Sequence, residues 1–102
     1  MKSIIQAEKN YCYLCKEETG YKVERSGLEE HHIFGGSSNR NNSEKYGLKV
    51  YLCPEHHQYG PEAVHKNPNY GYDYYLKQIG QQAFAEKYPE LDFKAIFGKN
   101  FI

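Results

Sequence analysis

The sequence predicts an α+β fold, in which two short strands are followed by helices within a single domain of 102 residues. Two β-friendly runs, Leu28 to Phe34 and Leu48 to Cys53, lie on either side of a polar stretch and predict an antiparallel hairpin. Apolar residues recur at helical spacing further along, from Tyr72 to about Lys87. Pairs of cysteine and histidine residues flank the two strands.

The first half of the chain carries a local signal for each remaining element. Residues 11–20 are predicted to form a compact turn around two cysteines, and residues 21–25 to form a first short strand. The polar residues 37–45 are expected to be a loop. Pro54 and Glu55 then suit the first turn and the positive end of a helix, which Gly60-Pro61 interrupts or bends.

The second half predicts a helical extension over about residues 70–98. Its main helix ends before Pro89, and Gly80 inside it costs about 1 kcal/mol relative to alanine. A last helical turn follows around residues 93–97, and Gly98 is placed to end it. We expect this tail to pack rather than to act.

Composition and charge are those of a soluble globular protein. Hydrophobic residues make up 39% and charged residues 25% of the chain, values typical of a folded domain. The formal net charge of zero argues against tight binding driven by bulk positive charge, so affinity for nucleic acid has to come from a local cluster or a bound metal. Neither a signal-peptide core nor a membrane-length apolar run is present, and we expect a cytoplasmic protein.

Cysteine and histidine spacing predicts a structural zinc site. Three cysteines cannot form a closed set of disulfides, whereas Cys12-x-x-Cys15 and Cys53-x-x-His56 together supply three thiolates and one imidazole for tetrahedral zinc. Three unrelated buried thiols are the alternative. Either histidine of the pair His56-His57 could be the zinc ligand, because the spacings Cys-x-x-His and Cys-x-x-x-His both occur in zinc sites. We assign His56 to zinc and His57 to catalysis, since neighbours at a helix start point in directions about 100° apart.

The stretch from Leu28 to His65 resembles the HNH, or ββα-metal, nuclease family. In that family the first strand ends in a metal ligand followed by the general base, and these positions match His31 and His32. The metal ligand on the family's helix matches His57. The resemblance therefore implies an HNH-type endonuclease with a bound catalytic cation.

The resemblance also implies a layout for the domain. A ββα-metal core would occupy about residues 27–66, and the helical tail would follow it. The pair Cys12-x-x-Cys15 is similar to the zinc knuckle that many members carry, here formed by residues 11–20 together with 53–56.

A narrower resemblance is to the phage recombination-enhancement, RecA-dependent nucleases. It implies DNA as the substrate, and RecA or another recombination protein as a partner in phage or prophage recombination. The chain departs from this pattern because it has no long basic amino-terminal extension that could engage a DNA or RecA filament, which weighs against RecA dependence. The motifs that carry the resemblance are His31-His32-Ile33-Phe34-Gly35-Gly36, Ser43 to Leu48, Leu52-Cys53, His56-His57 and Val64-His65.

The implied reaction is hydrolysis of DNA phosphodiester bonds by an endonuclease or nickase. His32 would accept the proton of the attacking water, a contribution of about 10²–10⁴-fold for a group whose reference pKa is about 6.5. A cation held by His31 and His57 would neutralise charge on the phosphoryl group. Imidazole ligands favour Mn²⁺, Ni²⁺ or Zn²⁺ over Mg²⁺, so we expect Mn²⁺ to support activity at least as well as Mg²⁺.

Two assignments near this site have open alternatives. His65 lies beyond the Gly60-Pro61 break, and it either binds the cation or the scissile phosphate, or is a surface or capping histidine. The family's asparagine, whose side chain braces the loop behind the base, matches Asn39, Asn41 or Asn42. We choose Asn42, although most asparagines in such loops are turn formers.

The remaining candidates concern contact with nucleic acid. Arg40, Lys45 and Lys66 either bind backbone phosphates or are solvated surface charges. Four tyrosines either stack on unpaired bases or pack around the last helix; they are Tyr70, Tyr72, Tyr74 and Tyr75. The alternative function for the whole chain is a non-catalytic zinc-binding module that holds DNA or a protein partner.

Overall fold

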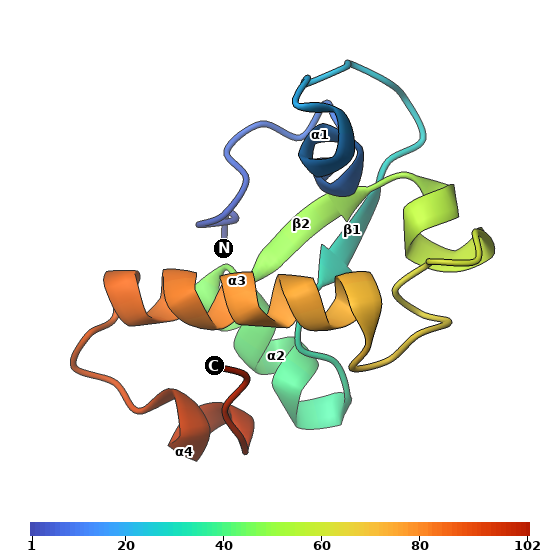
Figure 1. Cartoon of the computed structure of the whole chain (residues 1–102). Helices are drawn as coiled ribbons and strands as arrows, with labels where there is room; N and C mark the ends of the chain where they lie inside the picture. Colours follow the sequence, from blue (N-terminus) through green and yellow to red (C-terminus); the bar gives the residue numbers. More distant parts are fainter.

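The computed structural model describes all 102 residues and shows a small sheet with helices around it (Figure 1). The predicted α+β class is therefore confirmed. No helix is both long and apolar enough to cross a membrane. The elements are, in order, α1 (Tyr13–Thr19), β1 (Glu29–His32), α2 (Ser37–Tyr46), β2 (Lys49–Leu52), the single π-helical turn η1 (Glu55–Tyr59), α3 (Gly71–Lys87) and α4 (Phe93–Phe97).

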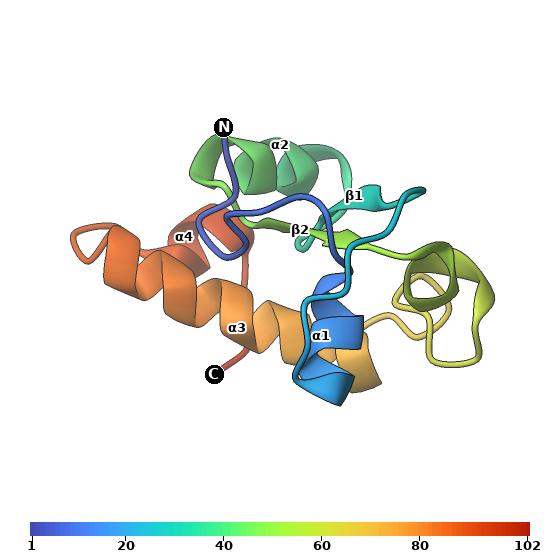
Figure 2. The ribbon, with the colours of Figure 1, turned by 90° about the horizontal axis from the view of Figure 1, so that it is seen from above.

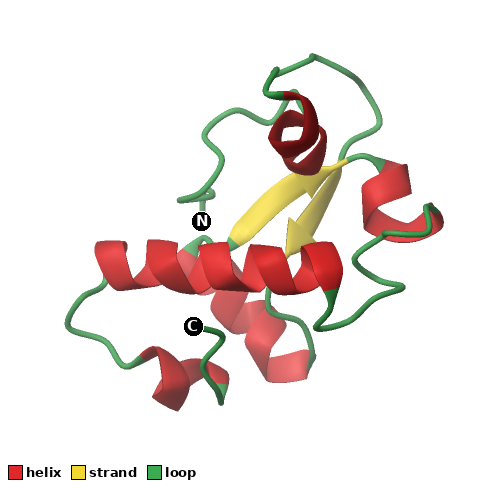
Figure 3. Ribbon diagram, in the orientation of Figure 1, coloured by secondary structure: helices red, strands yellow, loops and turns green.

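The sheet consists of two strands only (Figure 3). They pair antiparallel, as the sequence predicted, with His31 opposite Val50 and His32 opposite Lys49. Comparison of Figures 1 and 2 places α3 on one side of this sheet and α2 on the other. Because successive side chains of a strand point to opposite faces, the two histidines of β1 are directed to different sides of the sheet.

The segment predicted to be a loop between the strands is in fact helix α2. Its ten residues are almost all polar, so they lack the apolar periodicity that marks a helix in a sequence. Tertiary hydrogen bonds supply the missing stabilisation: the side-chain amides of Asn39 and Asn42 donate to the carbonyls of Phe97 and Ile96, at 3.0 and 3.2 Å. Contacts with α4 thus override a weak local preference. Gly47, with φ of 72°, ends the helix.

The amino-terminal region also differs from the prediction. The compact turn is helix α1, whose first turn is capped by the Cys12 sulfur accepting a hydrogen bond from the Cys15 amide at 3.4 Å. The strand predicted over residues 21–25 is wrong. Only one bridge forms there, between Tyr11 and Glu24, because no second extended segment lies alongside to continue the pairing.

The predicted helices after the sheet are confirmed, with one refinement. The helix after Pro54 is only the turn η1, which ends at Gly60 where the backbone closes on itself. A Cβ atom at Gly60 would lie 2.6 Å from the carbonyl oxygen of Glu55, so this approach requires glycine. Helices α3 and α4 agree with the predicted tail, and Gly98 ends α4 with φ of 99°.

Phe34, two residues after the end of β1, is the centre of an aromatic cluster that joins the tail to the sheet. Its ring centroid lies 5.2 Å from that of Phe93, 4.8 Å from Phe97 and 5.4 Å from Phe101. Ser43 of α2 holds the same residue from the backbone side. The Ser43 hydroxyl accepts from the Phe34 amide at 3.0 Å and donates to the Phe34 carbonyl at 2.9 Å. The end of β1 is therefore fixed from two directions.

Gly80 is the residue of α3 that lies against Phe34. A Cβ atom there would be 2.9 Å from Cε2 of the buried Phe34 ring. The substitution Gly80→Ala therefore introduces a steric clash, which opposes a gain of about 1 kcal/mol in helix propensity. Because overpacking costs about 1–3 kcal/mol, we expect a net loss of about 1 kcal/mol in the free energy of unfolding, measured by urea denaturation. Gln82→Ala, on the exposed side of α3, is the control and should change stability by less than about 0.5 kcal/mol. A more stable Gly80→Ala variant would contradict this packing.

Candidate metal centres

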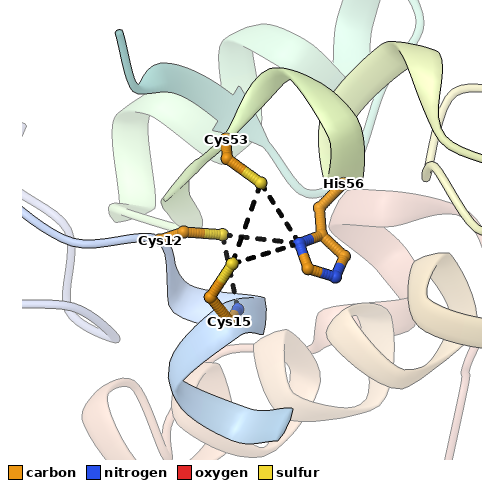
Figure 4. Close-up of side chains that lie close together, drawn as sticks. All are labelled: Cys12, Cys15, Cys53 and His56. Atoms are coloured by element: carbon orange, nitrogen blue, oxygen red, sulfur yellow. Dashed lines mark hydrogen bonds between the residues drawn. The ribbon is translucent and has the colours of Figure 1, made fainter. Parts of the chain in front are cut away.

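Cys12, Cys15, Cys53 and His56 converge on one point, although they come from distant parts of the chain (Figure 4). The first two flank the start of α1, and the other two flank the start of η1. Each residue offers one ligand atom, and these atoms all lie within 4.8 Å of one another. We call this group the Cys₃His cluster. It contains the four residues that the sequence predicted for zinc, including His56 rather than His57.

Distances within the Cys₃His cluster fit a tetrahedral zinc ion. The sulfurs of Cys15 and Cys53 are 3.8 Å apart, and Nδ1 of His56 lies 3.2, 3.5 and 3.7 Å from the sulfurs of Cys53, Cys15 and Cys12. Tetrahedral zinc, with Zn–S of about 2.3 Å and Zn–N of about 2.0 Å, separates two sulfurs by about 3.8 Å and sulfur from nitrogen by about 3.5 Å. The cluster could therefore hold a structural metal ion such as zinc.

Groups behind the Cys₃His cluster orient its imidazole. Nε2 of His56 lies 3.1 Å from Oε2 of Glu18, and the Tyr72 hydroxyl donates to the same oxygen at 2.6 Å. The carboxylate thus leaves Nδ1 of His56 free for a metal. Burial alone would lower the pKa of His56, but its contacts with Glu18 and Cys53 raise it. Burial and the two neighbouring thiols raise the pKa of Cys15 to about 12, so an ion that binds at neutral pH has to displace protons.

A second group, the three-histidine cluster, consists of His31 on β1, His57 on η1 and His65 after it. The ring centroid of His31 lies 5.1 Å from that of His57 and 5.3 Å from that of His65. The Nε2 atoms of His57 and His65 are 2.9 Å apart. All three offer ligand atoms within 4.8 Å of one another. His65, whose role the sequence left open, therefore lies beside the two histidines predicted to hold a cation.

Backbone pairing returns His65 to the cluster after the Gly60-Pro61 turn. The amides of Val64 and His65 donate to the carbonyls of His56 and His57, at 2.9 and 3.2 Å. Residues eight apart are thus held side by side. No helical or strand periodicity in the sequence indicates this pairing.

His31 has a buried ring nitrogen that lacks a binding partner. It is only 5% exposed, and its Nε2 is the one buried side-chain nitrogen or oxygen that has no hydrogen-bond partner. Burial, with the neighbouring imidazoles of His57 and His65, lowers the pKa of His31 to about 3, so the ring is neutral at physiological pH. An unpaired buried polar atom costs about 1–3 kcal/mol. A metal ion is a partner that three converging imidazoles can share.

Glu29 is a candidate positioning residue that sequence reasoning missed. Its Oε1 lies 2.7 Å from Nδ1 of His57, which leaves Nε2 of His57 facing His65. A carboxylate behind a metal-binding imidazole fixes the ring and raises its basicity. The available signal was the spacing, because Glu29 precedes His31 by two positions and therefore shares its face of β1.

His32 faces the other side of the sheet and does not join the three-histidine cluster. Its Nε2 lies 2.8 Å from Oε1 of Glu44 and 3.7 Å from Oε1 of Glu30. These three residues form another group with ligand atoms close together, but the ammonium of Lys49 already lies 3.0 Å from Glu44 and 3.2 Å from Glu30. The group is therefore an ion-pair network around His32.

Asn42 is also outside both clusters, because its amide is committed to Ile96 of α4. Ser43, the next residue, instead contacts the segment after β1, because its hydroxyl bonds the amide and the carbonyl of Phe34. Among the three candidate phosphate contacts, Lys66 is next to His65 in the chain, and its ammonium donates to the Tyr59 carbonyl at 2.9 Å. The other two, Arg40 and Lys45, are exposed on α2.

No protein-family model, curated protein or solved structure matches the chain. The two clusters are therefore supported by the geometry and burial of their residues. Their common feature is η1, which contributes His56 to one cluster and His57 to the other.

Removal of a thiolate should empty the Cys₃His cluster. We expect the purified chain to hold one tightly bound zinc ion and Cys53→Ser to lose it. The free energy of unfolding should fall by about 3 kcal/mol or more, which is the stabilisation from a ligand present at about 100 to 1,000 times its Kd. Metal analysis and urea denaturation measure the two effects. His65→Ala leaves the Cys₃His cluster intact and should keep the zinc; full zinc content in Cys53→Ser would count against the site.

Loss of the Glu29 charge should weaken metal binding at the three-histidine cluster. Calorimetric titration of the zinc-loaded chain with Mn²⁺ or Co²⁺ measures the Kd of the metal for a second and more exchangeable site. We expect Glu29→Gln to raise its Kd by about 10–100-fold, the usual effect of losing a group behind a metal ligand. Glu30→Gln is the matched control, because the neighbouring carboxylate faces the opposite side of β1. Equal affinities in the two variants would rule out a positioning role for Glu29.

Proposed function

We propose that the chain is a metal-dependent endonuclease or nickase that hydrolyses DNA phosphodiester bonds on an HNH-type, ββα-metal core. The observation that carries the proposal is the three-histidine cluster, in which the buried and unpaired Nε2 of His31 lies beside two further imidazoles. The order of elements supports it. Strand β1, strand β2 and the turn η1 follow one another, with α2 inserted between the strands, and β1 and η1 each supply a histidine.

The proposed cation site divides its tasks among the three histidines. A divalent cation bound there would neutralise charge on a phosphodiester and acidify a water molecule. His31 is fixed by burial and His57 by Glu29, whereas His65 is exposed. The cluster therefore reaches the surface at His65, where a phosphodiester can approach. Three imidazole ligands favour Mn²⁺, Ni²⁺ or Zn²⁺ over Mg²⁺.

His32 is the proposed general base. In the structure its Nε2 lies within hydrogen-bond distance of Glu44; once released from this contact, the ring would accept the proton of the attacking water. The ring lies on the face of β1 opposite His31, so action on a water at the cluster requires the His32 side chain to leave Glu44. Because His32 is not a ligand of the three-histidine cluster, a substitution at His32 tests the general base without removing the cation site.

Lys66 is the proposed phosphate contact nearest to the cluster in the chain. Its ammonium bonds only a backbone carbonyl, that of Tyr59, and no carboxylate neutralises it. Arg40 and Lys45 belong to α2, on the side of the sheet away from α3. They would reach only the flanking parts of a bound duplex.

Supercoiled plasmid incubated with the zinc-loaded chain and Mn²⁺ tests the proposal, with conversion to nicked or linear DNA as the readout. We expect His31→Ala to reduce cutting to background, because it removes a cation ligand, and His32→Ala to slow it by about 10²–10⁴-fold. Gln82→Ala, prepared identically, should cut at the wild-type rate.

The outcomes separate the parts of the proposal. If His31→Ala is inactive and His32→Ala cuts normally, the cation site stands and the base is another group. If the wild-type chain cuts nothing with Mn²⁺, Mg²⁺, Ni²⁺ or Zn²⁺, the nuclease proposal fails and a non-catalytic zinc-binding module that holds DNA or a protein partner takes its place.

A further inference from the structure

An aromatic cavity of about 590 Å³ opens beside α1 and the start of α3, away from the three-histidine cluster. Tyr70, Tyr72 and Tyr75 line it, and Tyr70 is 74% exposed. This volume is within the range of ligand pockets in proteins. Three of the four tyrosines between residues 70 and 75 thus line an open cavity.

Two of these tyrosines are held in place by carboxylates of α1. The Tyr72 hydroxyl donates to Glu18 at 2.6 Å, and the Tyr75 hydroxyl donates to Glu17. These hydrogen bonds anchor the hydroxyls and favour ring positions along the wall of the cavity.

The charge around the cavity is of one sign. Its lining includes three carboxylates, those of Glu17, Glu18 and Glu62, and no lysine, arginine or histidine. Glu62 is exposed and makes no ion pair or side-chain hydrogen bond, so its charge is free to meet a ligand. Aromatic faces are negative as well and attract cations. The cavity is complementary to an organic cation and repels phosphate.

A small hard metal ion does not fit this arrangement. The carboxylates of the lining are not among the groups of the molecule whose ligand atoms converge, and the cavity is much larger than one ion. A guanidinium group satisfies both features, because it is planar, stacks on aromatic rings and bonds carboxylates through several donors. A peptide backbone on either side of it would fill the remaining space.

We propose that this cavity is a docking site for a protein segment that presents an arginine side chain between the tyrosines and the carboxylates. The guanidinium lies over the tyrosine rings and pairs with Glu62, while Glu17 and Glu18 keep the rings fixed. The site is independent of the nuclease activity, because none of its residues belongs to the three-histidine cluster.

The test is an NMR titration of the zinc-loaded full chain with a blocked alanine-arginine-alanine tripeptide. The same peptide with citrulline in place of arginine keeps the shape and removes the charge. We expect the arginine peptide to shift the amide signals of Gly71, Tyr72 and Tyr75 with a Kd of about 1 mM. Binding should be at least about threefold weaker for citrulline. Equal binding of the two peptides would overturn the proposal, because the cavity would then recognise only apolar surface.

Matched variants locate the contact without disturbing zinc. Tyr70→Ala and Glu62→Gln change cavity residues that supply no ligand atom to the Cys₃His cluster, and each should weaken binding of the arginine peptide by at least about threefold. Tyr21→Ala and Glu90→Gln change an equally exposed tyrosine and an exposed glutamate outside the cavity, and should leave the Kd unchanged. Equal loss in both sets would overturn the site.

Two further ligands separate the sources of the cation and the class of partner. Free arginine should bind more weakly than the tripeptide, because it lacks the flanking peptide groups; tighter binding of free arginine would replace the protein segment by a small metabolite. A single-stranded oligonucleotide should not shift the Gly71 signal. If it does so in place of the peptide, the tyrosines stack on bases and the proposal is wrong.

Discussion

The segment from Cys53 to His57 is the constraint on which both candidate metal centres depend. Cys53 directly follows β2 and supplies a thiol, His56 supplies an imidazole to the same cluster, and His57 belongs to the other cluster. The His57 amide donates to the Cys53 carbonyl at 2.9 Å, so the turn is closed tightly. A π-helical turn is rare and is often found at functional sites. Here it allows adjacent histidines to serve separate groups of ligands.

Because the turn is shared, the two clusters are mechanically linked. A zinc ion that fixes Cys53 and His56 also fixes the backbone from which His57 projects, and His57 in turn holds His65 through its carbonyl. The loop from Gly60 to His65 contributes no residue to the Cys₃His cluster, yet its path depends on the same turn. An ion held by the Cys₃His cluster would therefore also order the backbone that positions the three-histidine cluster.

Strand β1 divides two very different electrostatic environments. One face carries the imidazoles of His57 and His65 around the buried His31, and the other carries His32 within a network of two carboxylates and Lys49. Burial alone would lower the pKa of Lys49, but its ion pairs with Glu44 and Glu30 raise it, so the ammonium stays charged beneath His32. A single strand four residues long thus separates the three-histidine cluster from a charged network by the alternation of its side chains alone.

Chemistry encoded in a few neighbouring residues could be predicted from the sequence, and geometry set by distant contacts could not. The Cys12-x-x-Cys15 and Cys53-x-x-His56 pairs specify a ligand set by residue type and spacing, and the structure brings them together. The helix α2 escaped prediction because its stability comes from hydrogen bonds to α4, made by Asn39 and Asn42. The contact of Asn42 with the Ile96 carbonyl depends on the same packing of α2 against α4 and leaves no local signal in the sequence.

The position of His65 depends likewise on a backbone pairing across a turn, which leaves no periodic trace. Glu29 could have been found from the sequence, because alternation along β1 places it on the same face as His31. A glutamate near a histidine pair nevertheless suggests surface charge, unless its partner His57 on η1 is known. The residues that were missed are those whose partners lie in another element.

Glu18 joins the Cys₃His cluster to the aromatic cavity. Its Oε2 accepts from Tyr72 at 2.6 Å and lies 3.1 Å from Nε2 of His56, so α1, η1 and α3 meet at one carboxylate. A guanidinium that drew Glu18 away would remove the group that orients the zinc-binding ring, whereas one that pairs with Glu62 leaves it in place. Docking through Glu62 and Tyr70 is therefore the arrangement that leaves Glu18 beside His56. In this arrangement a chain with no net charge binds a basic partner without losing the contact that orients the His56 ring.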